Sequence, residues 1–191
     1  LMITALRTPL ESVLANGWRR FDPALKAGFI VAICVSLLAY GFEMTNLTLH
    51  HDDLVHLMVQ QPLVGYYLGR FAHSWLFFYG LGGQFAPFLH MTVGMLLMAT
   101  YGVVVAHFWG ARRALDIALV AAIVCVFPYM ASVYQYNSVM IAYPLAHLLV
   151  ALGVVLSARA RVVPIVLAAL FFFLAFSIYQ AVLANAVTIF L

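Results

Sequence analysis

The chain has 191 residues, of which 66% are hydrophobic and only 8% are charged, and its formal net charge is +3. Ordinary soluble domains carry roughly 25% charged residues, and a mean hydropathy of +1.07 excludes a water-exposed globular surface. The basic residues form no patch interleaved with aromatics, which argues against a nucleic-acid partner. Composition therefore predicts an all-α polytopic membrane protein.

The first predicted element is a cytoplasmic or interfacial segment over residues 1–23. Apolar residues fall on one side of a helix predicted over residues 5–22, as in helices that lie in the membrane surface. Arg19 and Arg20 interrupt any apolar core of a signal peptide. The chain begins with Leu1 and ends inside an apolar run, so we expect a single transmembrane domain over 1–191 that is an N-terminal fragment of a longer protein.

Five apolar runs follow in chain order, and a helix needs about 20 such residues to cross a bilayer. The predicted spans are residues 24–42, 87–109, 114–130, 139–157 and 162–180. The loop over residues 43–85 is too polar to cross, and it is expected to carry one or two short interfacial helices outside the cytoplasm. A helix of about thirty residues from Val162 would be ~45 Å long, so a break is predicted at Ser177-Ile178-Tyr179-Gln180.

Basic residues mark the inner face of this topology, because cationic loops stay in the cytoplasm. Eight of the nine Lys and Arg residues lie in three clusters, namely Arg7, Arg19, Arg20 and Lys26; Arg112 and Arg113; Arg159 and Arg161. The N-terminus is therefore predicted to be cytoplasmic. The ninth, Arg70, lies in the 43–85 loop on the opposite side.

Arg70 is a candidate phosphate ligand, since its planar guanidinium suits forked binding of phosphate oxygens. The preceding Gly69 would let a ligand approach the backbone closely. Two alternatives stay open, namely an ion pair with a nearby acid (Glu43, Asp52 or Asp53) and contact with lipid headgroups.

Asp52 and Asp53 are candidate catalytic acids in the same loop. Adjacent side chains point about 100° apart on a helix, so the two are not expected to flank a substrate together. One of them could act as a general base; the alternative is a solvated loop. His50, His51 and His56 with the two acids could bind a divalent metal, but their spacing matches no tight zinc motif, and we expect no cofactor.

Five short motifs in order carry a family resemblance. They are Asp52-Asp53, Gly69-Arg70, Phe127-Pro128-Tyr129, Tyr134-Gln135-Tyr136-Asn137-Ser138 and Ser177-Ile178-Tyr179-Gln180. Together they resemble the Gtr-type (GtrII-like) O-antigen glucosyltransferases, which belong to the GT-C class of membrane glycosyltransferases. The resemblance covers residues 30–180, approximately. One position departs from it, because this chain has Asn137 where the family typically has an aspartate.

The resemblance implies an enzyme that moves a glucosyl or similar hexosyl group from a polyprenyl-phosphate donor to a glycan acceptor such as O-antigen, by inverting displacement. It implies a location in the bacterial inner membrane, among membrane lipids, with the active site on the periplasmic face. Asp52, in preference to Asp53, would be the base, and Arg70 would bind the donor phosphate. The substrate-binding residues implied are His51, Tyr134, Tyr136, Asn137, Tyr179 and Gln180.

The competing interpretation is a transporter or lipid flippase in which Asp52 and Arg70 form a gating pair. Transporters place charges and broken helices near the middle of the membrane. The predicted spans carry no Lys, Arg or Glu away from their ends, which favours the enzyme.

Overall fold

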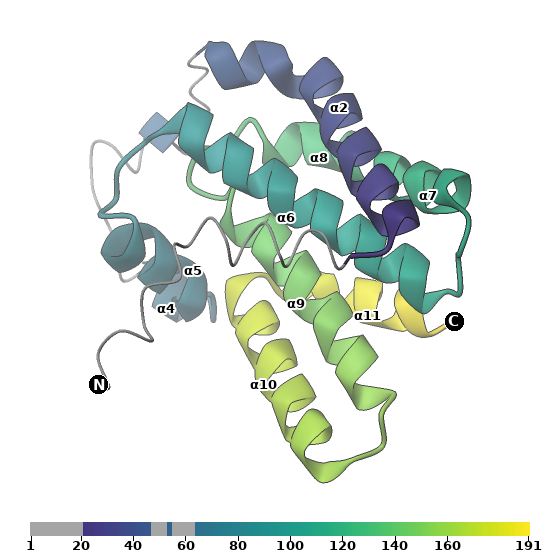
Figure 1. Ribbon diagram of the computed structural model, residues 1–191. Coiled ribbons are helices and arrows are strands. Elements are labelled where there is room, and N and C mark those ends of the chain that lie inside the picture. The colour runs from purple at the N-terminus through teal and green to yellow at the C-terminus, as the bar shows by residue number, and fades with distance from the viewer. Residues whose placement is uncertain (1–20, 47–52, 55–63) are drawn as a thin grey trace, which may run out of the picture.

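The computed structural model describes residues 21–46, 53–54 and 64–191, and this part of the chain is all-helical, as predicted (Figure 1). Its helices are α2 (Pro23–Thr45), α4 (Val64–Tyr67), α5 (Phe71–Ser74), η2 (Trp75–Gly80), α6 (Pro87–Phe108), α7 (Ala114–Val126), α8 (Pro128–Val133), α9 (Ala142–Ser157), α10 (Val162–Ile178), η3 (Gln180–Val182) and α11 (Leu183–Phe190). The predicted interfacial helix over 5–22 lies almost wholly outside the described residues.

Two of these helices are long and apolar enough to cross a membrane, by length and composition. They are α2 with 23 residues and α6 with 22, each about 33–34 Å long at 1.5 Å per residue. Helices α7, α9 and α10 are apolar but shorter, with 13, 16 and 17 residues. Helix length thus supports two of the five predicted spans and leaves the five-span bundle a prediction.

Around the turn between α7 and α9, the helix ends differ by a few residues from two of the approximate span boundaries. The helix in the span over 114–130 is interrupted at Phe127, whose backbone is extended (φ −55°, ψ 135°), since the helical region is disfavoured for a residue before proline. Helix α8 then restarts with Pro128 at its first position. The span over 139–157 begins three residues late, at Ala142.

The predicted break in the last span is confirmed. Helix α10 ends at Ile178, Tyr179 is extended (φ −155°, ψ 111°), and η3 begins at Gln180. The 43–85 loop also carries short helices as expected, since α4, α5 and η2 follow one another there. Phe71 of α5 packs against Phe173 of α10, with ring centroids 5.6 Å apart.

Helix α6 is the centre of the bundle, with α2 and α7 packed on it and α9 crossing it (Figure 1). Small residues lie where two helices approach each other most closely. A methyl group at Gly102 of α6 would lie 2.7 Å from the Cα atom of Ala121 in α7. Such contacts are typical of membrane helices, which pack through small side chains. Helix α10 pairs with α9 as a hairpin, and this brings its broken end to the turn between α8 and α9.

Candidate active site

Arg70 is held at the junction of the 64–80 segment and the broken end of α10. It precedes the first residue of α5, and Gly69 before it adopts a positive φ of 71°. Its Nε donates to Oε1 of Gln180 (3.3 Å), and its guanidinium carbon lies 5.3 Å from the ring centroid of Tyr179. Gln180 in turn donates to the Leu68 carbonyl (3.0 Å). These contacts orient the guanidinium while leaving its terminal nitrogens without a described carboxylate partner.

Arg70 lines a cavity of about 350 Å³, which we call the Arg70 cavity. Its walls come from α5, α8, the 134–141 turn, α9 and the break after α10, and the other lining residues are His73, Tyr129, Ser132, Val133, Tyr136, Ser138, Val139, Tyr143 and Tyr179. Arg70 is the one Lys, Arg, Asp or Glu among the described residues that line it. Tyr143 stacks on Tyr179 with ring centroids 4.2 Å apart. The cavity therefore combines one cation with hydroxyl groups and aromatic faces.

Asp53 is fully buried, with 0% of its surface exposed. Its carboxylate accepts hydrogen bonds from the backbone N–H of Asn137 (3.1 Å), the side-chain Nδ2 of Asn137 (3.3 Å) and the backbone N–H of Ser138 (3.4 Å). A carboxylate with several N–H donors is well compensated for burial. In this arrangement Asp53 holds the 134–141 turn. Asp52 and His51 lie outside the described residues.

The predicted substrate-binding residues divide into two groups. Tyr136 and Tyr179 line the Arg70 cavity, and Gln180 holds its guanidinium. Tyr134 and Asn137 are only 1% exposed and do not line it. Tyr134 meets Tyr40 edge-on at 4.9 Å, and burial, with Cys125 and Tyr40 nearby, raises the pKa of its phenol. These two buried side chains lie behind the wall of the cavity and hold the 134–141 turn in place.

His73 was not predicted from the sequence as a site residue. It lies in α5, three residues after Arg70, and contacts the 134–141 turn. Its Nε2 lies 3.1 Å from the Ser138 carbonyl, and because a carbonyl only accepts, Nε2 is the donor. Ser138 thus accepts from His73 while donating to Asp53. A sequence signal was present, since residues three apart on a helix share a face and His73 follows Arg70 by three.

Two tyrosines of the cavity were also not assigned in advance. Tyr129 belongs to the Phe127-Pro128-Tyr129 motif, and burial, then a hydrogen bond to Tyr179, raises the pKa of its phenol. The group is therefore a neutral donor at neutral pH. Tyr143, at the start of α9, resembles any interfacial tyrosine, and nothing in the sequence separates it from one.

No group of three or more His, Cys, Asp or Glu is placed to hold a metal among residues 21–46, 53–54 and 64–191. His50, His51, Asp52 and His56 lie outside the described residues.

Residues 41–191 match the family model described as glucosyl transferase GtrII. The chain belongs to this family. The match includes all five motifs that carried the resemblance, and it makes the protein a glycosyltransferase whose family implies glucosyl transfer. Comparisons with curated proteins and with solved structures gave no match.

A glycosyltransferase brings together a sugar donor and an acceptor. Four of the five motifs contribute residues to the wall of the Arg70 cavity: Arg70, Tyr129, Tyr136 with Ser138, and Tyr179. The fifth motif reaches the same place through Asp53, which is hydrogen-bonded to the turn that forms one wall. The motifs therefore converge in space on one cavity.

Proposed function

We propose that the enzyme transfers a glucosyl or similar hexosyl group from a polyprenyl-phosphate donor to a glycan acceptor such as O-antigen. The observation that carries this proposal is the Arg70 guanidinium, which Gln180 and Tyr179 orient at the wall of a 350 Å³ cavity. A guanidinium binds phosphate through paired N–H groups, and an anionic donor would neutralise it.

The reaction would be a single displacement at the anomeric carbon. Asp52 accepts the proton of the acceptor hydroxyl as its oxygen forms the new bond. The bond between the anomeric carbon and the phosphate oxygen breaks, and its electron pair leaves with the polyprenyl phosphate. Arg70 stabilises the negative charge that grows on the phosphate. No general acid is needed, because a phosphate leaves readily, and the anomeric centre inverts.

Asp53 would serve as a positioning residue in this scheme. It is buried and hydrogen-bonded to Asn137 and Ser138, so it anchors the chain next to the base. Asn137 and Tyr134 would support the site without touching sugar. His51, Tyr136 and Tyr179 would contact substrate directly.

The apolar helices and the basic clusters support the proposed membrane setting. Helices α2 and α6 are long enough to span, and with α7, α9 and α10 they would form five spans of a bacterial inner-membrane protein. The clusters at Arg112 and Arg159 would then face the cytoplasm, with Arg70 on the periplasmic face. The polyprenyl tail of the donor would lie among the helices and membrane lipids.

The test is transfer from polyprenyl-phosphate glucose to candidate glycan acceptors by the purified chain. Arg70→Ala should lower transfer by about a hundredfold or more, the usual effect of losing a group that stabilises developing charge. Asp52→Asn should lower transfer by a similar factor, because the variant has no base to accept the proton of the acceptor hydroxyl. Arg159→Ala is the matched arginine control and should leave transfer unchanged. Undiminished transfer by Asp52→Asn would overturn the assignment of Asp52 as the base.

Topology offers a second test that does not depend on activity. A cysteine placed at position 70 should react with a membrane-impermeant reagent added from the periplasmic side. A cysteine placed at position 159 should react with the same reagent only after the membrane is permeabilised. Cytoplasmic labelling at position 70 would contradict the proposal.

A further inference from the structure

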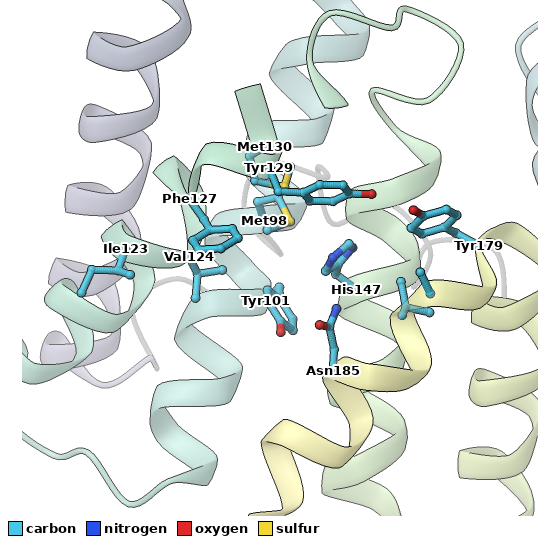
Figure 2. A pocket seen from close by; sticks show the side chains of 12 residues that line it. Met98, Tyr101, Ile123, Val124, Phe127, Tyr129, Met130, His147, Tyr179 and Asn185 are labelled. Atoms are coloured by element: carbon cyan, nitrogen blue, oxygen red, sulfur yellow. The ribbon is translucent and has the colours of Figure 1, made fainter. Parts of the chain in front are cut away.

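A second cavity, of about 370 Å³, adjoins the Arg70 cavity and shares Tyr129 and Tyr179 with it. We call it the His147 cavity. It lies between α6, α8, α9 and α11, and Figure 2 shows Tyr129, Tyr179, His147 and Asn185 around a common space. At about 30 Å³ per water molecule, its volume corresponds to about a dozen waters. A hexose ring with its hydroxyls is small enough to fit within this volume.

His147 presents a hydrogen-bond acceptor to this space. Its Nδ1 lies 2.8 Å from the Tyr143 carbonyl, and since a carbonyl only accepts, Nδ1 carries the proton. The neutral ring therefore has Nε2 as an acceptor. The His147 ring also meets the Tyr101 ring edge-on at 5.6 Å, so its orientation is fixed by contacts at two sides.

Two further polar groups lie beside His147. Figure 2 shows the Asn185 carboxamide directed toward His147 and Tyr101. Within the described residues, neither the Asn185 carboxamide nor the Tyr101 hydroxyl has a hydrogen-bond partner in the protein. In so apolar a bundle, polar side chains that converge on a cavity point to a ligand.

The chemistry of the walls selects the class of ligand. No Lys, Arg, Asp or Glu is among the lining residues, which argues against an ion. Phenol, carboxamide and imidazole groups can donate and accept at once, and Tyr101 adds an aromatic ring to the wall. This combination suits a neutral, hydroxyl-rich ring where these groups meet, and the other seven of the twelve lining residues are apolar. A prenyl chain would leave the same polar groups without partners, which costs free energy.

We propose that the His147 cavity holds the hexosyl group of the donor while Arg70 holds its phosphate. The inference rests on the proposed function and assigns its sugar-specificity residues: His147, Asn185 and Tyr101. The anomeric carbon would lie near Tyr129 and Tyr179, which border both cavities. The rest of the Arg70 cavity is then left for the acceptor hydroxyl.

The experiment compares two soluble short-chain probes by calorimetry on the full chain in detergent: geranyl phosphate with glucose attached and geranyl phosphate alone. Wild type should bind the glucosylated probe at least about tenfold more tightly. His147→Asn keeps a donor where Nδ1 was but removes Nε2, and should lose most of this preference. His147→Gln places a polar group where Nε2 was and should retain more of it. Asn185→Leu tests the same site from another helix.

The outcomes separate the inference from the proposed function. His107→Asn is the matched control and should keep the wild-type preference. His107 lies at the C-terminal end of α6, where its Nδ1 is 3.2 Å from Nη1 of Arg112. An unchanged preference in both His147→Asn and Asn185→Leu overturns the inference, and so does equal weakening of both probes, which would place the prenyl chain in the cavity. A preference that depends on His147 in a chain that transfers no glucose overturns the proposed function alone.

Discussion

Asp53 and Asn137 lie 84 positions apart in the chain and are joined by two hydrogen bonds, from the backbone N–H (3.1 Å) and from the side-chain Nδ2 (3.3 Å) of Asn137. Both residues are buried. The pair ties the acidic motif to the turn between α8 and α9. It also gives a physical meaning to the one departure from the family pattern, because an aspartate at position 137 would face a second carboxylate.

Asn137→Asp should therefore destabilise the protein, and more so as the pH rises. A carboxyl introduced beside a buried carboxylate has its folded-state pKa raised above the unfolded value of about 3.9. Stability is then kept below that value and is lost as the pH rises through the raised pKa. We expect a loss of about 3 kcal/mol at neutral pH and little at pH 4, measured by thermal unfolding of variant and wild type at each pH.

Asn46→Asp is the matched control for this substitution. Asn46 is the exposed C-cap of α2, where its Nδ2 donates to the Phe42 carbonyl (2.8 Å). The same change there removes that hydrogen bond but buries no charge, so it should cost about 1 kcal/mol. An Asn137→Asp variant as stable as wild type across the pH range would contradict the direct contact between Asp53 and Asn137.

His73 should control catalytic rate through the position of the turn. In the wild type, the imidazole of His73 is parallel to the Phe77 ring, with ring centroids 6.5 Å apart. His73→Phe keeps an aromatic ring at this place but loses the hydrogen bond to the Ser138 carbonyl. One hydrogen bond contributes about 1 kcal/mol, so kcat should fall about fivefold while the KM for the donor stays the same. His73→Gln retains an N–H donor and should restore much of the rate. A purely structural role would lower both variants' stability without this rescue.

Much of this arrangement could be predicted from sequence because it depends on local rules. Composition predicts the all-helical fold, and helix length predicts the break that brings Tyr179 and Gln180 to Arg70. The end of α7 at Phe127 had a local signal too, in Pro128, but the apolar run around it was interpreted as one continuous span.

The rest depends on contacts that no periodicity encodes. The 134–141 turn is irregular, so nothing in its sequence distinguishes Tyr136, which lines the cavity, from Tyr134, which is buried against Tyr40. The bond between His73 and Ser138 joins residues 65 positions apart. The His147 cavity likewise needs residues from α6, α8, α9 and α11, and in the sequence His147 is a single histidine in an apolar run.

Gln180 should set the affinity of the enzyme for its anionic donor. Gln180→Glu would place a carboxylate where Oε1 now accepts from Nε of Arg70, and the resulting ion pair would compete with phosphate for the guanidinium. We expect the KM for the donor to rise about tenfold or more. Gln180→Leu leaves Arg70 charged but unsupported and should have a smaller effect. The contrast is measured with donor titrations at saturating acceptor, and an equal effect of both variants would show that only orientation matters.

Gly94 should be the least replaceable glycine of the bundle. A methyl group there would overlap the Met140 carbonyl and come within 3.2 Å of the Tyr134 ring, so α6 would have to move away from the turn that forms the site. Gly94→Ala should lower the midpoint of thermal unfolding and reduce transfer together. Gly41→Ala is the matched control in α2, because a methyl group there meets nothing within 4 Å. Since alanine stabilises a helix interior by about 0.5–1 kcal/mol over glycine, the control should raise the midpoint. A Gly94→Ala variant that also gains stability would refute the close contact between α6 and the turn.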